Sequence, residues 1–102
     1  MTITNEPVFI RLNIKITQNE NFIAHTVTMS KGMVADEHQM TFIRASIRNT
    51  LQTYASPIAS NNIVEYITKC FKCQKYRFFR RIDDENNVKI SVTSRTVKTN
   101  RI

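Results

Sequence analysis

The chain has 102 residues, of which 41% are hydrophobic and 23% are charged, with one glycine and two prolines. This composition is typical of one small globular domain with its own core, and it excludes a low-complexity or linker-like chain. No run of about 18 apolar residues is present, so we predict no membrane-spanning helix. The segment MTITNEPVFI carries an acid and no basic region typical of an export signal. We therefore expect a protein of the cytoplasm or nucleus, not a secreted one, with reduced cysteines.

The formal net charge of +7 is concentrated in the C-terminal third of the chain. Residues 1–68 contain five basic and five acidic residues, whereas residues 69–102 contain ten basic and three acidic ones. Residues 69–81, KCFKCQKYRFFRR, hold six bases, four aromatic residues and both cysteines. A neutral body with a basic end favours a polyanionic partner. A charge excess that only maintains solubility is the alternative.

The first predicted elements are two strands. Residues 8–17, VFIRLNIKIT, alternate, which indicates a strand with one buried face. The inward side chains are Val8, Ile10, Leu12, Ile14 and Ile16, and the outward ones are Phe9, Arg11, Asn13, Lys15 and Thr17. After a polar turn at residues 18–21, a second strand over residues 22–30 places Ile23, His25, Val27 and Met29 on one face. Together they predict an antiparallel hairpin.

Two helices are predicted in the middle of the chain. Asp36 is suited to cap a helix over residues 37–54, where apolar residues recur at helical spacing. This helix is expected to end before Pro57, since the residue preceding a proline avoids the helical conformation. Ser60 is predicted to cap a second helix, whose buried side extends to Cys70 or Phe71.

A second hairpin is predicted at the basic end. Alternation returns over residues 73–82, and residues 87–97 form the partner strand after a turn at residues 83–86. The inward side chains of the first of these strands are Tyr76, Phe78 and Ile82. Arg80 interrupts that apolar face. We expect Arg80 to reach solvent near the hairpin tip, unless a bulge reverses the alternation there.

The predicted fold is therefore α+β, with two β-hairpins flanking two helices in the order ββααββ. Because the strands of each hairpin pair locally, we expect a four-stranded antiparallel sheet with both helices on one face. The order of the strands between the two hairpins is left open. Residues 1–102 are predicted to form a single domain, with residues 97–102 as a frayed basic tail.

The sheet face turned away from the helices is the candidate functional site. It collects basic side chains, which attract phosphate, and aromatic rings, which stack on unpaired bases. The predicted nucleic-acid-binding residues are Arg11, Lys15, Lys75, Arg77, Phe79, Arg81, Lys89 and Arg95. In an alternative geometry, the second hairpin enters a major groove as a two-stranded ribbon, with Arg77 and Arg81 reading base edges.

Metal and catalytic chemistry have little support in the sequence. Cys70 and Cys73 are half of a zinc site at most, and the two histidines lie far upstream, so neither a metal nor a cofactor is expected. Cys70 is expected to pack as a small hydrophobe and Cys73 to be partly exposed. The consecutive acids at residues 83–85 are expected to face solvent around a turn. Without a glycine-rich phosphate loop or a nucleophile elbow, the sequence predicts a non-enzymatic protein.

Three functions are consistent with these features. The first is a small basic protein that binds DNA or RNA through its open sheet face, as a regulator or accessory factor. The second is a protein-interaction module that forms a homodimer, or docks an acidic partner, through the same face or an edge strand. The third is binding to an anionic membrane surface. This function ranks last because the bases lie on predicted strands and not on an amphipathic helix. No membrane partner is therefore expected.

Overall fold

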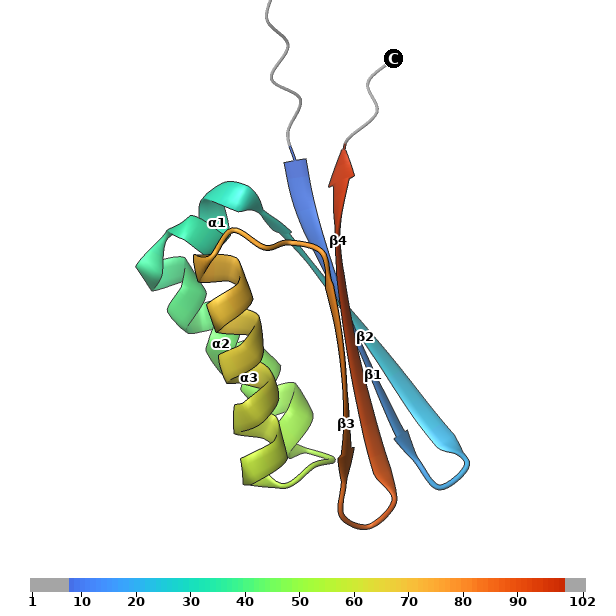
Figure 1. Ribbon diagram of the computed structural model, residues 1–102. Coiled ribbons are helices and arrows are strands. Elements are labelled where there is room, and N and C mark those ends of the chain that lie inside the picture. Colours follow the sequence, from blue (N-terminus) through green and yellow to red (C-terminus); the bar gives the residue numbers. More distant parts are fainter. Residues whose placement is uncertain (1–7, 99–102) are drawn as a thin grey trace, which may run out of the picture.

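The computed structural model describes residues 8–98 and has the predicted α+β architecture. The strands are β1 (Val8–Gln18), β2 (Asn21–Ser30), β3 (Phe78–Asp84) and β4 (Val88–Lys98), and the helices are α1 (Lys31–Ala35), α2 (Glu37–Gln52) and α3 (Pro57–Lys72). Setting aside the short helix α1, their order is ββααββ. The strands form one antiparallel sheet, and the helices cover one of its faces (Figure 1).

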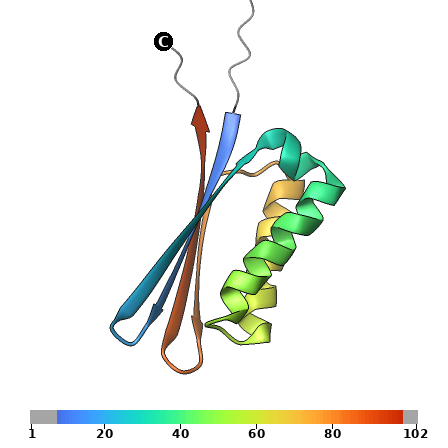
Figure 2. The same cartoon turned by 180° about the vertical axis from the view of Figure 1, so that it is seen from behind.

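The strand order β2-β1-β4-β3 settles how the two hairpins meet. The long strands β1 and β4 pair at the centre of the sheet in one uninterrupted register, from Val8 opposite Lys98 to Gln18 opposite Val88. The shorter partners β2 and β3 form the two edges. Figure 2, which shows the molecule from behind, makes clear that the face opposite α2 and α3 is free of helices.

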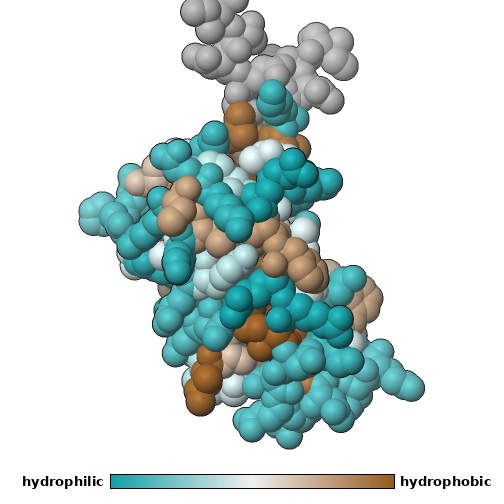
Figure 3. All heavy atoms as spheres, in the orientation of Figure 1, coloured by the Kyte–Doolittle hydropathy of each residue, from teal (hydrophilic) through white to brown (hydrophobic). Residues whose placement is uncertain are grey.

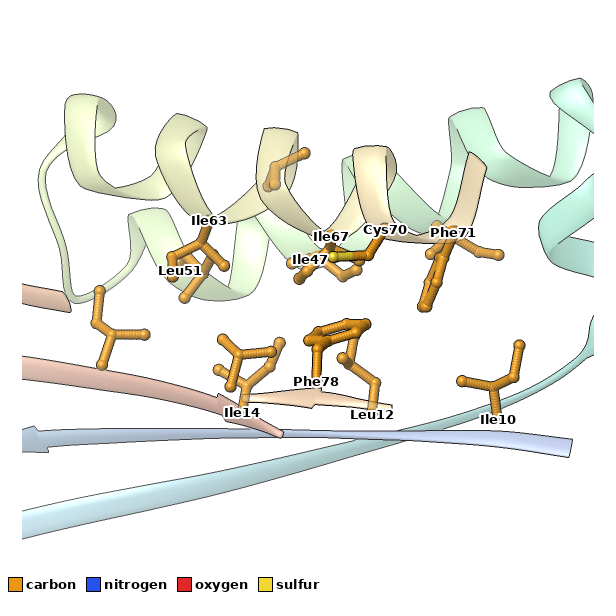
Figure 4. Packing of buried hydrophobic residues seen from close by; sticks show 14 of the residues in the cluster. Ile10, Leu12, Ile14, Ile47, Leu51, Ile63, Ile67, Cys70, Phe71 and Phe78 are labelled. Carbon is orange, nitrogen blue, oxygen red and sulfur yellow. The ribbon is translucent and has the colours of Figure 1, made fainter. Parts of the chain in front are cut away.

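Alternation in the strands and helical spacing in α2 and α3 produce the core between the two layers. The fully buried side chains of β1 alternate with those that face away from the helices, as predicted for residues 8–17. In Figure 4 the labelled side chains from the helices point toward those from the sheet: Ile47, Leu51, Ile63, Ile67, Cys70 and Phe71 lie above Ile10, Leu12, Ile14 and Phe78. No helix within residues 8–98 is long and apolar enough to cross a membrane.

The helix α3 begins earlier than predicted. Its N-cap is Ser56, whose Oγ accepts a hydrogen bond from the Ala59 N–H at 3.2 Å, and Pro57 occupies the first turn. Proline suits this position because it lacks an N–H, which the first turn leaves unpaired in any case. Ser60, the predicted cap, is fully buried inside the helix. The helix α1, capped by Ser30, is not predicted.

The predicted strand over residues 73–82 also starts five residues too early. The helix α3 continues to Lys72 and ends in a Schellman motif, in which the N–H groups of Gln74 and Lys75 donate to carbonyls of the last helical turn. Gln74 adopts the required positive φ of 58°. Only from Phe78 does the chain join the sheet.

The strand β4 ends one residue later than predicted. Residues 97 and 98 belong to β4, which runs to Lys98, so the start of the predicted frayed tail is wrong. Residues 99–102 of that tail lie outside the described residues.

Asp84 does not face solvent, although the acids at residues 83–85 were all predicted to do so. Its carboxylate accepts hydrogen bonds from the Ser56 N–H at 2.8 Å and from Ser56 Oγ at 3.0 Å, and it is half-buried, whereas Asp83 is exposed. The bond from the Ser56 N–H is the main cause that lowers the pKa of Asp84. Asp84 therefore fastens the end of β3 to the start of α3.

Candidate nucleic-acid interface

The sheet face without helices, called the open face below, carries the side chains that alternate with the core. The strand registers assign to it Phe9, Arg11, Asn13, Lys15 and Thr17 from β1, Phe22, Ala24, Thr26, Thr28 and Ser30 from β2, Phe79, Arg81 and Asp83 from β3, and Lys89, Ser91, Thr93, Arg95 and Val97 from β4. Five of these residues are basic and one is acidic. The five bases, Arg11, Lys15, Arg81, Lys89 and Arg95, are called the basic cluster below.

The basic cluster is a concentration of like charge. Arg11 and Arg95 face each other directly across the β1–β4 ladder, an arrangement that costs free energy when no anion lies between the two side chains. Lys15 and Arg81 occupy one row of the sheet, each opposite Ser91 of β4. The single acid, Asp83, lies 3.8 Å from Arg81, and both side chains are more than half exposed. Such a pair is weak, so it offsets little of the positive charge on the open face.

Two exposed aromatic rings flank the basic cluster. Phe79 on the edge strand β3 is 64% exposed, and Phe22 on the opposite edge strand β2 is 61% exposed. The ammonium group of Lys15 lies 5.3 Å from the centroid of the Phe22 ring. Phe22 was not among the predicted site residues. Its place in the alternation of residues 22–30, one position before the inward Ile23, is the signal that identifies it.

A shallow hollow lies in the open face among the basic side chains. Its volume is about 230 Å³, and it is lined mainly by Lys15, Phe79, Arg81 and Lys89. Three cations and one aromatic ring thus surround one concave patch. This arrangement suits a ligand that presents both a phosphate and a flat ring.

Of the eight predicted site residues, six lie on the open face and two precede β3. Lys75 lies outside the strands, in the Schellman motif that follows α3, and its side chain is exposed. Arg77 is exposed and lies one residue before β3; continuing the β3–β4 register by one residue sets it opposite Arg95. The Ser94 hydroxyl donates to the Tyr76 carbonyl at 2.9 Å and holds this segment along β4. Arg77 therefore extends the basic cluster, whereas Lys75 does not.

Arg80 does not reach solvent fully, which contradicts the prediction. It is half-buried against the helices. The β3–β4 register continues through it without a bulge, so Arg80 points to the helix side. Its guanidinium lies 4.7 Å from the centroid of the Tyr66 ring, and its Nη2 donates to Asn62 Oδ1 at 3.0 Å. Burial is the main cause that raises the pKa of Tyr66.

The helical layer carries a second basic surface. A groove of about 790 Å³ between α2 and α3 is lined by Arg44, Arg48, Lys69 and Lys72, together with Glu65. Arg48 Nε donates to Asn61 Oδ1 at 3.0 Å. No aromatic side chain lines this groove. Figure 3, in which the helices and the sheet lie side by side, shows a mostly hydrophilic surface with separate hydrophobic patches. It is the larger cavity, but it lacks the stacking surfaces of the open face.

The cysteines occupy the environments that the sequence predicts. Cys70 is buried in the core and Cys73 is exposed at the end of α3, and both are free thiols. Within residues 8–98, no group of three or more His, Cys, Asp or Glu side chains is arranged to hold a metal ion.

Comparisons of the chain with protein-family models, with curated proteins and with solved structures found no match. The function is therefore inferred from the geometry and the charge of the molecule itself.

Proposed function

We propose that this protein binds nucleic acid, with the open face as its binding surface. The observation that supports this most strongly is the basic cluster, in which five cations and a single acid share one uncovered sheet face. Phosphate groups neutralise such a cluster, and the release of their counterions contributes to affinity. The protein acts without catalysis, as a regulator or accessory factor.

The aromatic rings favour single-stranded over double-stranded ligands. Phe22 and Phe79 are both more than 60% exposed and lie at opposite edges of the open face. In a duplex the faces of the bases are already stacked on one another, whereas unpaired bases are free to stack on protein rings, worth about 1–3 kcal/mol per base. A single strand that crosses the sheet reaches both rings and passes over the basic cluster.

Charge argues against the alternative in which two copies meet through their open faces. A symmetric contact presents the same patch on both subunits, so two basic clusters would face each other. Like charges in a desolvated contact cost several kcal/mol. An acidic protein partner is the form of the alternative that the charge still permits.

The proposal is tested by measuring the fluorescence anisotropy of labelled single-stranded and duplex DNA and RNA at two salt concentrations. The variant Lys15→Glu/Lys89→Glu reverses two exposed charges of the basic cluster. We expect it to weaken binding of single strands by at least about tenfold, because two phosphate contacts are replaced by repulsion. Affinity of the wild type should fall steeply with salt.

The matched control is Lys69→Glu/Lys72→Glu, which makes the same change in charge on the exposed surface of α3. It should weaken binding much less, because only the long-range potential changes. Equal losses in the two variants, or no binding of any of the four ligands at low salt, would refute the proposed function.

A further inference from the structure

The strand β2 is an edge strand without the usual protection against further pairing. It is ten residues long, pairs with β1 in a continuous register, and contains no Lys, Arg, Asp, Glu or Pro. Natural edge strands are commonly protected by charged residues, proline, bulges or short length. The opposite edge, β3, has seven residues, of which Arg80, Arg81, Asp83 and Asp84 are charged. The backbone of β2 is therefore the one sheet edge in residues 8–98 that is suited to accept another strand.

Exposed apolar side chains lie beside this edge on the helix side. Phe42 of α2 is 73% exposed, and Met33 of α1 is 36% exposed. Both line a groove of about 230 Å³ between β2 and α2, together with Val27 and Ile43. No charged residue lines this groove. A partner that pairs with the β2 backbone would also cover these side chains, and removing them from water is favourable by about 25 cal/mol per Å².

We infer that β2 pairs antiparallel with β2 of a second copy of this chain. A two-fold axis perpendicular to the sheet relates the two strands and keeps both open faces on the same side. The two four-stranded sheets then form one continuous sheet. On the helix side, each α2 approaches its counterpart, so that Phe42 of each copy is covered by the groove of the other.

The charge distribution favours a second copy of this chain as the partner of β2. The basic cluster lies on β1, β3 and β4, and β2 contributes no base to the open face. The dimer axis is therefore free of like charges, unlike a contact between two open faces. A strand without charged residues offers an acidic or basic partner no attraction, whereas it is compatible with itself. In the dimer, two basic clusters are joined on one surface.

The inference is tested by sedimentation equilibrium of the full chain without nucleic acid, so its outcome is independent of the proposed function. The wild type should approach twice the 11.9 kDa mass of one chain as its concentration is raised. In Ala24→Lys/Thr28→Lys, both substitutions lie at exposed positions of β2. We expect this variant to raise the dimer dissociation constant by at least about tenfold, because lysine on an edge opposes strand pairing.

The control Thr41→Lys/Ala45→Lys adds the same charge at exposed positions of α2 in the other groove, and it should stay dimeric. If the β2 variant loses its circular dichroism spectrum, Phe42→Ser provides the test, because Phe42 is already exposed in the single chain. It should also weaken the dimer. A wild type that stays monomeric at high concentration, or a dimer that withstands the Phe42 variant and any folded β2 variant, would overturn the inference. So would a dimer that only Phe79→Asp disrupts.

Discussion

Arg80 and Arg81 are adjacent in sequence but have opposite surroundings. Arg80 lies on the helix side of β3, where it packs on Tyr66 and donates to Asn62. Arg81 lies on the open face, and its only ion pair among the described residues is the exposed one with Asp83. Variants of the two side chains therefore test stability and the proposed binding separately.

We predict that Arg80→Ala lowers the free energy of unfolding by about 1–2 kcal/mol, because a cation–π contact and a hydrogen bond are lost. Its effect on nucleic-acid affinity should be small. Arg81→Ala should change stability by less than about 0.5 kcal/mol, since its pair is exposed. It should reduce the slope of log affinity against log salt by roughly 0.7–0.9, the value for one phosphate contact. Urea denaturation and anisotropy titrations of both variants measure these effects, and the reverse assignment would contradict the geometry.

Asp84 makes stability depend on acid pH. The Ser56 N–H and hydroxyl bond its carboxylate and lower its pKa in the folded state. A lowered pKa means that the stabilisation is complete above the pKa of an unfolded aspartate, about 4. It is lost as the pH falls through the lower pKa of the folded state.

We therefore predict that Asp84→Asn lowers the free energy of unfolding at pH 7 by about 1.5–3 kcal/mol, the range for hydrogen bonds to a charged group. The difference from the wild type should shrink as the pH falls below about 4. Chemical denaturation at several pH values measures it. Asp83→Asn is the control, since Asp83 is exposed and should contribute less than about 1 kcal/mol. A constant difference across this range would show that Asp84 does not titrate as the geometry requires.

At the scale of single elements, the strands with unbroken alternation could be predicted from the sequence. The pattern of residues 8–17 defines β1 and both of its faces, because the period of a strand is two and one face is buried. The capped helix α2 could likewise be predicted, since Asp36 accepts hydrogen bonds from the His38 and Gln39 N–H groups as its position indicates.

The elements around α3 could not be predicted correctly, because their signals have two meanings. Pro57 is equally consistent with the end of one helix and the first turn of the next. The alternation of residues 73–77 resembles that of a strand. However, the N–H groups of Gln74 and Lys75 donate to carbonyls at the end of α3 and not to a neighbouring strand. The prediction that Lys75 lies on a strand of the open face is therefore wrong, whereas the positions predicted for Arg11, Lys15 and Lys89 on that face are confirmed.

At the scale of the whole molecule, the sheet order produces the candidate site. The basic end of the chain supplies Arg81, Lys89 and Arg95, and β1 from the neutral part supplies Arg11 and Lys15. Pairing of β1 with β4 brings the two groups together on one face. The sequence predicts which residues face outward, but the juxtaposition depends on the strand order, which only long-range packing determines.

The most direct test of the proposed nucleic-acid interface is lysine acetylation of the wild-type protein, with and without a saturating single-stranded oligonucleotide, read by mass spectrometry. All of the lysines compared are exposed in the free protein, so each is its own reference. Contact through the open face predicts strong protection of Lys15 and Lys89, with Lys69 and Lys72 on the helical layer still reactive. Protection of Lys69 and Lys72 with Lys15 and Lys89 unchanged would place the ligand on the helices and contradict the proposal.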